Sequence, residues 1–281
     1  MPKAKRNRFV QGATERLLGA VLAGGVAARL SYRLGGLGRV GVTRHEVALP
    51  PGLRLARPLR VGFASDFHAG PTTAPALFDD LLAAIRREAP DVLLLGGDYV
   101  SFAAHHIDAL QTFLRAAHAP FGTFAVLGNH DVWNGRARVE AGLRDAGIEV
   151  LVNRSLPLPE PFGSVSICGI DDPWLGAPAA GPTFAQAGPV RIYLMHSPDG
   201  LHWLDGQQFA LGLAGHTHGG QIALRDGTPL FHAGGPWSRE HTYGRFELPG
   251  NGTLVVSRGV GCSAIPLRLN ADPELLICTL A

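Results

Sequence analysis

The sequence contains few cysteines and little charge. Its three cysteines, Cys168, Cys262 and Cys278, lie far apart in a chain of 281 residues and form no C-x-x-C pair. A disulfide framework or a structural zinc site is therefore not expected, and we predict that these cysteines are buried as small apolar residues. Charged residues make up 17% of the chain and the formal net charge is +2. This balance argues against a strongly basic surface, so no nucleic-acid partner is expected.

The N-terminal part of the chain has few acidic residues. Residues 1–45 hold nine Lys and Arg residues and one acidic residue, Glu15, which gives +8; because the whole chain carries +2, the remaining residues carry −6. The basic stretch from Lys3 to Arg8 precedes an apolar run from Leu17 to Ala28, without a twin-arginine signal. This run is too short to span a bilayer, which requires about 20 apolar residues.

Three interpretations of this segment stay open: a signal-like region, an interfacial helix on anionic lipid, and a flexible extension or a helix packed on the rest of the chain. The charge asymmetry favours the first two. We therefore set residues 1–57 apart as an N-terminal extension and expect a membrane-associated or exported bacterial protein. Residues 1–45 would contact the anionic membrane surface. A cytoplasmic protein is the alternative.

Residues 58–281 have the pattern of an α/β domain. Short apolar runs at Leu59–Ser65, Asp91–Leu95 and Gly122–Leu127 predict strands, and helical spacing predicts helices after the first two. Five further strands are predicted at Val165–Ile170, Val190–Leu194, Phe209–Ala214, Leu254–Ser257 and Leu275–Thr279. This βαβ order places the residues that follow the strands at one edge of a sheet, where open α/β sheets bind ligands.

Polar clusters with metal-binding chemistry follow five of these runs. They are Asp66-Phe67-His68, Gly97-Asp98, Gly128-Asn129-His130-Asp131, Met195-His196 and Gly215-His216-Thr217-His218. Carboxylate, amide and imidazole groups are the ligands of divalent cations such as manganese, which we expect first, and iron or zinc; thiolate is absent from every cluster. Together they predict a two-metal hydrolytic site with Asp98 as the bridging carboxylate.

The residue types also predict how such a site works. Two cations would activate a bridging hydroxide that attacks phosphorus, so no protein nucleophile is needed. His130 would protonate the leaving group, held in orientation by Asp131. Trp133 and Trp174 follow acidic loops and are candidates for the pocket wall. Arg258 and Arg268 would contact a substrate phosphate or form surface salt bridges.

The order D-x-H, G-D, G-N-H-D, H and G-H-x-H resembles the calcineurin-like metallophosphoesterases, over about residues 58–281. The flanking His196-Ser-Pro-Asp199 and Gly215–Gln221 segments resemble the bacterial membrane-associated or exported subgroup. The resemblance implies a two-sheet α/β sandwich flanked by helices, with the dimetal site at the strand ends. It also implies two ligand sets: Asp66, His68, Asp98 and His218 for one metal, and Asp98, Asn129, His196 and His216 for the other.

These observations predict a binuclear metal-dependent phosphoesterase acting on phosphomonoesters or phosphodiesters. One alternative is a membrane-associated pyrophosphohydrolase of a lipid-linked or nucleotide-diphosphate substrate, motivated by the basic N-terminal segment. A different class, a non-catalytic partner-binding module, would be expected to have lost ligands, and this chain keeps every one.

Overall fold

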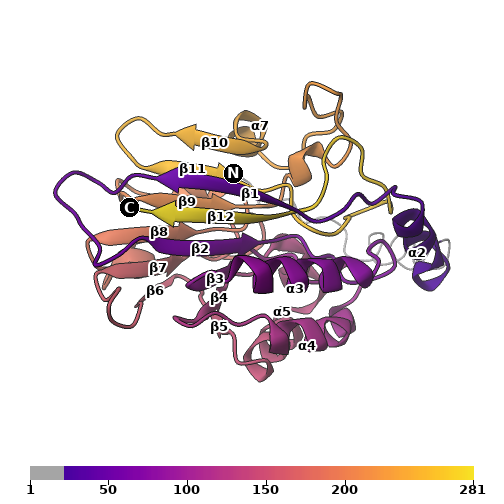
Figure 1. The fold of residues 1–281 in the computed structure, drawn as a ribbon, viewed down its shortest axis with the longest axis horizontal. Helices are drawn as coiled ribbons and strands as arrows, with labels where there is room; N and C mark the ends of the chain where they lie inside the picture. Colours follow the sequence, from indigo (N-terminus) through magenta and orange to yellow (C-terminus); the bar gives the residue numbers. More distant parts are fainter. Residues whose placement is uncertain (1–21) are drawn as a thin grey trace.

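The computed structural model describes residues 22–281, which form two six-stranded sheets stacked face to face with helices on the outer faces (Figure 1). In the first sheet the spatial order is β1 (Gly41–Val47), β12 (Glu274–Leu280), β2 (Leu59–Ala64), β3 (Val92–Leu95), β4 (Thr123–Ala125) and β5 (Glu149–Val150). In the second sheet it is β10 (Gly244–Glu247), β11 (Thr253–Val256), β9 (Leu211–Ala214), β8 (Val190–Leu194), β7 (Val165–Gly169) and β6 (Arg154–Pro157). Both sheets are mixed, and the predicted two-sheet α/β architecture is confirmed.

Helices cover the outer face of each sheet. The first sheet is covered by α3 (Ala76–Glu88), α4 (Ile107–Ala116) and α5 (Asn129–Asp145), and the second by shorter elements, α6 (Ala180–Phe184) and the 3-10 helix η3 (Pro198–Trp203). In α3, Leu77, Leu81 and Ile85 recur every four residues and are all buried, because this spacing places them on one face. The remaining helices are η1 (Ala23–Gly25), α2 (Val26–Arg33), η2 (Ala104–His106), η4 (His218–Gly220) and α7 (Pro236–Glu240).

The strands alternate between two apolar layers. In β12, Leu276 and Cys278 face the layer between the sheets, whereas Leu275 and Ile277 face the helices. The three cysteines are all buried and unpaired, as predicted. The apolar side chains of this strand therefore contribute to one layer or the other, which is why residues 275–278 are apolar without interruption.

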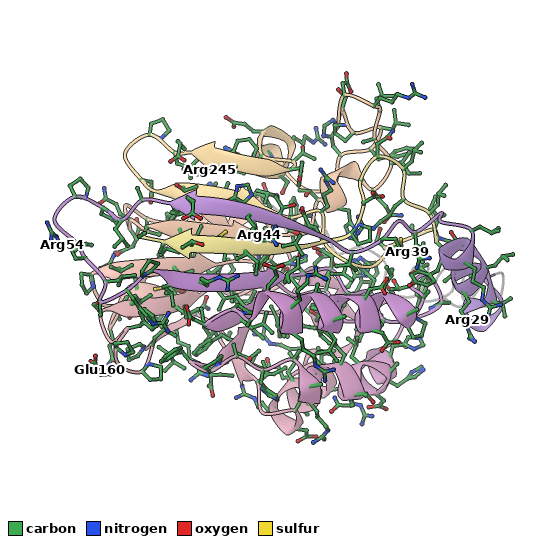
Figure 2. All side chains as sticks on the ribbon, in the orientation of Figure 1. Arg29, Arg39, Arg44, Arg54, Glu160 and Arg245 are labelled. Atoms are coloured by element: carbon green, nitrogen blue, oxygen red, sulfur yellow. The ribbon has the colours of Figure 1, made fainter. Side chains whose placement is uncertain are left out.

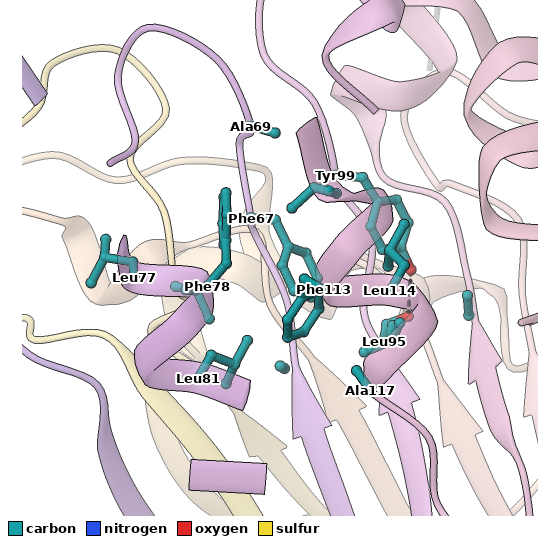
Figure 3. Close-up of a cluster of buried hydrophobic side chains, with 14 of the residues drawn as sticks. Phe67, Ala69, Leu77, Phe78, Leu81, Leu95, Tyr99, Phe113, Leu114 and Ala117 are labelled. Atoms are coloured by element: carbon teal, nitrogen blue, oxygen red, sulfur yellow. Dashed lines mark hydrogen bonds between the residues drawn. The ribbon is translucent and has the colours of Figure 1, made fainter. Parts of the chain in front are cut away.

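A buried aromatic cluster lies beneath the first ligand loop (Figure 3). Phe67, between Asp66 and His68 in sequence, stacks on Tyr99 with ring centroids 5.3 Å apart and packs against Phe113 at 5.6 Å. The Tyr99 hydroxyl donates to the carbonyl of Leu95 at 3.1 Å. Tyr99 is fully buried and acts as packing. This cluster anchors both the Asp66 loop and the Asp98 loop to the helical layer.

Strand β1 lies within residues 1–57, which the sequence analysis set apart as an extension. It pairs in parallel with β12 from Gly41↔Glu274 to Val47↔Leu280 and is thus hydrogen-bonded into the first sheet. The basic stretch Lys3–Arg8 and residues 17–21 of the apolar run lie outside the described residues. Within residues 22–281, no helix is long and apolar enough to cross a membrane.

Candidate metal centre

All five predicted clusters meet at one edge of the sandwich. Three follow strands of the first sheet, since β2 leads to Asp66, β3 to Asp98 and β4 to Asn129. Two follow strands of the second sheet, since β8 leads to His196 and β9 to His216. These five strands all end at this edge, so residues far apart in sequence become neighbours, as expected for a ligand site in an α/β sheet.

The first group of possible ligands contains Asp66, His68 and His218, whose ligand atoms lie within 4.8 Å of one another. The Nε2 atoms of His68 and His218 are 3.0 Å apart. His218 Nε2 is 3.5 Å from Asp66 Oδ1. All three side chains are buried. This group corresponds to the first predicted ligand set.

The second group contains Asp98, His196 and His216. His196 Nε2 lies 3.2 Å from His216 Nδ1 and 3.1 Å from Asn129 Oδ1. Asp98 Oδ2 is 3.4 Å from His196 Nε2 and 3.5 Å from His68 Nε2, so this one oxygen reaches both groups. Asp98 therefore has the geometry of a bridging ligand between two sites.

The chemistry of these donors fits two divalent cations. Four imidazole nitrogens converge in pairs, and each pair has a carboxylate beside it. Burial lowers the pKa of His68 and of His218 well below the ordinary value, and lowers that of His216 to about 3. These rings are therefore neutral and keep a lone pair for a metal.

Five of the candidate ligands adopt a left-handed backbone conformation, which is uncommon for residues other than glycine. The φ angles are 56° at Asp66, 45° at His68, 55° at Asp98, 70° at His216 and 54° at His218. Hydrogen bonds hold these turns: Asp66 N–H donates to Gly97 O at 2.9 Å and His68 N–H to Asp98 O at 3.0 Å. Strain of this kind persists where the surroundings fix the backbone, and it concentrates at functional sites.

Two glycines permit the close approach of the ligand loops. A Cβ atom at Gly128 would overlap the Asp98 carboxylate, and a Cβ atom at Gly215 would overlap that of Asp66. The glycines in the G-N-H-D and G-H-T-H clusters therefore make room for the carboxylates. They are needed for their lack of a side chain rather than for chemistry.

The distal ring nitrogens of the histidines are also held. His196 Nδ1–H donates to the carbonyl of Gly96 at 2.8 Å, which leaves Nε2 free to bind a metal. His68 Nδ1 lies 2.7 Å from Ser101 Oγ. Such partners fix the orientation of a ligating imidazole. The rings are thus preorganised by residues outside the predicted ligand set.

His130 lies beside the first group. Its ring is edge-on to that of His68, with centroids 4.8 Å apart, and its backbone N–H donates to Asp98 Oδ1 at 2.8 Å. The buried Nδ1 atom has no hydrogen-bond partner. Trp133 packs next to it at 6.1 Å. The position is compatible with the predicted contact to a leaving group, which stays a prediction.

Asp131 does not form the predicted contact with His130. Its buried carboxylate accepts hydrogen bonds from the backbone N–H groups of Asp98 at 2.8 Å, Tyr99 at 2.8 Å and Gly128 at 2.9 Å. These donors belong to the loops that carry Asp98 and Asn129. Asp131 therefore positions the ligand loops, and the interpretation that it orients His130 is wrong because the carboxylate is engaged elsewhere.

The loop after β7 carries the predicted Trp174 and also two acidic residues, Asp171 and Asp172, that were not predicted as part of the site. Asp172 is buried; its Oδ1 accepts from Leu175 N–H at 2.6 Å and its Oδ2 has no partner. Trp174 stacks over the ring of His216 with centroids 6.4 Å apart, which places it beside this candidate ligand. Arg136 of α5 donates to both oxygens of Asp171 at 3.1 and 3.0 Å and fixes the loop. The available signal was the Asp171-Asp172 pair directly after a strand that ends at this edge.

The two predicted arginines have different environments. Arg268 is buried and donates to the carbonyls of Ala271 at 2.7 Å and Arg258 at 2.9 Å, with Nη2 3.2 Å from His218 Nδ1. It forms neither a surface salt bridge nor an open phosphate contact, so both interpretations are wrong for Arg268. The Arg258 guanidinium lies over the ring of Tyr243 at 3.9 Å and lines a pocket of ≈ 570 Å³ next to Gly219.

Comparison with known proteins agrees with this geometry. The sequence model of the calcineurin-like phosphoesterase family matches residues 59–226, more than half of the chain. The chain is 31% identical over 230 residues to phosphodiesterase YaeI of Escherichia coli, covering 80% of this chain and 83% of YaeI. The chain therefore belongs to the calcineurin-like phosphoesterase family. It is a metallophosphoesterase, a hydrolase with a dimetal site.

Two further relatives extend the comparison. The chain is 29% identical over 295 residues to the uncharacterized metallophosphoesterase YkuE of Bacillus subtilis, covering 100% of this chain and 99% of YkuE. It is 26% identical over 292 residues to the UDP-2,3-diacylglucosamine pyrophosphatase LpxG of Chlamydia trachomatis, covering 84% of this chain and 88% of LpxG. The similarity to YkuE and to LpxG thus extends over most of the length of each relative.

Proposed function

We propose that this enzyme hydrolyses phosphodiesters at a centre of two divalent cations, with manganese as the first candidate and iron or zinc as alternatives. The observation that carries the proposal is the position of Asp98 Oδ2, 3.5 Å from His68 Nε2 and 3.4 Å from His196 Nε2. One carboxylate oxygen thus joins two donor sets. The similarity to a phosphodiesterase supports the substrate class.

The candidate site residues have different roles in this proposal. Asp66, His68, Asp98 and His218 hold one cation, and Asp98, Asn129, His196 and His216 hold the other. Two cations at these positions supply activation of water and neutralisation of phosphoryl charge. His130, with its unpartnered Nδ1, holds the proton for the departing alkoxide. Trp174 forms a wall over His216.

The first experiment measures metal dependence and ester preference of the full chain. After metal is stripped and Mn²⁺ restored, turnover of bis-p-nitrophenyl phosphate should return and exceed that of p-nitrophenyl phosphate. Preference for the monoester would overturn the diesterase assignment. Turnover that does not depend on a divalent cation would overturn the two-metal mechanism.

A second experiment tests the role of His130. The variant His130→Ala should lose more activity on a diester with an alkyl leaving group than on one with p-nitrophenolate, because a good leaving group needs no proton. His202→Ala, at an exposed histidine on η3, is the control. Equal losses on both esters would contradict a proton-donating role.

A second candidate function is hydrolysis of a pyrophosphate in a lipid-linked or nucleotide-diphosphate substrate. The similarity to LpxG over 88% of its length favours it. Comparing kcat/KM for UDP-2,3-diacylglucosamine with that for bis-p-nitrophenyl phosphate decides between the two. A value at least about a hundredfold higher for the pyrophosphate would replace the first proposal.

We also propose that the protein is membrane-associated or exported. The support is the +8 charge of residues 1–45, which suits an anionic lipid surface. Fractionation of cells that produce the full chain checks this. Recovery entirely in the cytosol at low salt would contradict it.

A further inference from the structure

Large apolar side chains are exposed on three segments at one end of the molecule. Each is between 42% and 78% exposed. Helix α2 and the residue that follows it contribute Val26, Leu30 and Leu34; the loop after η4 contributes Leu224, Leu230 and Phe231; the segment between β11 and β12 contributes Ile265, Leu267 and Leu269. Single exposed apolar residues are normal, but nine on three neighbouring segments form a patch that needs an explanation.

Backbone hydrogen bonds join the three segments into one surface. Arg268 N–H donates to Gly36 O, just after α2, at 2.8 Å. Ala223 N–H donates to Leu269 O at 2.9 Å, which ties the loop after η4 to the same strand-like segment. Figure 1 shows α2 beside the yellow segment that precedes β12. We call these nine side chains the apolar end face.

The spacing of the residues shows why they point outward. Val26 and Leu30 of α2 and Leu34, which directly follows the helix, recur every four residues, while Ala28 is buried. Leu267 and Leu269 flank the buried Arg268 in an extended segment, where alternate side chains face opposite sides. The pattern is that of an ordered surface rather than of a loop with random exposure.

The apolar end face adjoins the metal centre. Gln221 directly follows η4, the turn that carries His218, and its Nε2 donates to Ile265 O at 3.0 Å and Leu267 O at 3.1 Å. Arg268, between Leu267 and Leu269, lies 3.2 Å from His218 Nδ1. A single residue, Arg268, therefore separates Leu267 and Leu269 of the apolar end face from the candidate ligand His218.

The charge around this surface is basic. Arg29 and Arg33 are exposed on α2, and Arg39, which lies 3.9 Å from Asp80, follows shortly after the helix; residues 22–40 contain no acidic residue. Figure 2 shows Arg29 and Arg39 at the end of the molecule that carries α2. In the loop after η4, the positive charge of Arg225 is offset by the negative charge of the neighbouring Asp226. Apolar side chains with flanking arginines match the apolar and anionic layers of a bilayer surface.

We propose that the apolar end face docks the enzyme on an anionic lipid bilayer, and that its substrate is a phosphoester or pyrophosphate carried by a membrane amphiphile. The inference about the substrate rests on the proposed function. The docking itself does not. Insertion of the apolar end face into the headgroup region places the metal centre at the depth of the lipid phosphates. A substrate headgroup reaches the metals while its acyl chains stay in the bilayer.

The test is flotation of the full chain with vesicles of phosphatidylcholine, alone or mixed with phosphatidylglycerol. The wild type should float with the mixed vesicles. The double variants Leu267→Ser/Leu269→Ser and Leu230→Ser/Phe231→Ser should each lower the partition coefficient by about tenfold or more. Trp203→Ser, at an exposed tryptophan on η3, is the matched control and should float as the wild type does.

Activity on soluble bis-p-nitrophenyl phosphate separates this proposal from the proposed function. Both double variants should keep it within about twofold, because their side chains are exposed and hold no ligand. Wild-type binding by both variants would overturn the docking proposal, as would failure of the wild type to float. Sedimentation that shows a wild-type dimer and monomeric variants would overturn it in favour of a second copy as occupant. If the wild type does not hydrolyse soluble bis-p-nitrophenyl phosphate, that result would instead count against the proposed function.

Discussion

The two sheets contribute different chemistry to the metal centre. The first sheet supplies the candidate oxygen ligands, Asp66, Asp98 and Asn129, together with one histidine, whereas the candidate ligands from the second are all histidines, His196, His216 and His218. Each ligand group contains residues from both sheets. The metals would therefore join the two halves of the sandwich, with both candidate carboxylate ligands on the side of the first sheet.

The largest expected effect comes from removing the oxygen that both groups share. Asp98→Asn should lower kcat/KM for bis-p-nitrophenyl phosphate by about a thousandfold or more, since one charge compensates two cations. His196→Ala, which removes an imidazole donor from one group, should cost about a hundredfold in kcat/KM. Asp79→Asn, at an exposed position on α3, serves as the control. A larger loss of kcat/KM in His196→Ala than in Asp98→Asn would contradict the proposed difference between the two sheets.

Metal removal tests whether the cations join the sheets. Chelation should lower the Tm of the full chain by about 10 °C, because ligands that bind only the folded state stabilise it by mass action. In His216→Ala the Tm before and after chelation should differ by less, since one donor from the second sheet is missing. Differential scanning calorimetry with and without Mn²⁺ measures both. An unchanged Tm after full metal removal would show that packing alone holds the sheets.

Asp131→Asn tests how the first sheet holds its ligands. The amide would face the N–H groups of Asp98 and Gly128 with a donor in place of an acceptor, and we expect a loss of about 3 kcal/mol in the free energy of unfolding. Metal affinity should fall as well, because the Asp98 loop loses its support. Urea denaturation and metal titration measure the two effects, with the exposed Asp145→Asn on the same helix as control. Wild-type stability would show that the carboxylate is not needed.

The sequence allowed the candidate ligands to be predicted because each follows a short apolar run, which is typical of a buried strand. Leu93, Leu94 and Leu95 lead to Asp98 in this way. Strand β1 lacks this signal: Thr43, Arg44 and Glu46 are polar, and the strand is recognised by its pairing with β12. A local sequence pattern indicates that a segment is buried, but it does not indicate which strand the segment pairs with.

The roles of Asp131 and Arg268 were inaccessible for a related reason. Both side chains form most of their hydrogen bonds with backbone groups, which any residue type offers, so the sequence does not identify these partners. A charged residue next to a ligand therefore appears catalytic in sequence even where it holds a loop. The predicted fold and ligand set depend on residue chemistry, whereas these supporting contacts depend on the folded backbone.

The smallest effect concerns Asp172, which is an exception to the division between the sheets. It is a buried carboxyl from the second sheet, and burial raises its pKa to about 6. Because the folded pKa exceeds the unfolded value, this group destabilises the fold as pH rises from about 4 through 6. Asp172→Asn keeps an acceptor for Leu175 N–H and carries no charge, so the variant should gain stability relative to the wild type at pH 8 but not at pH 4. Urea denaturation at both pH values checks this. A loss of stability at pH 8, larger than at pH 4, would mean that the charged carboxylate is a favourable part of the metal centre and that the second sheet also contributes an oxygen.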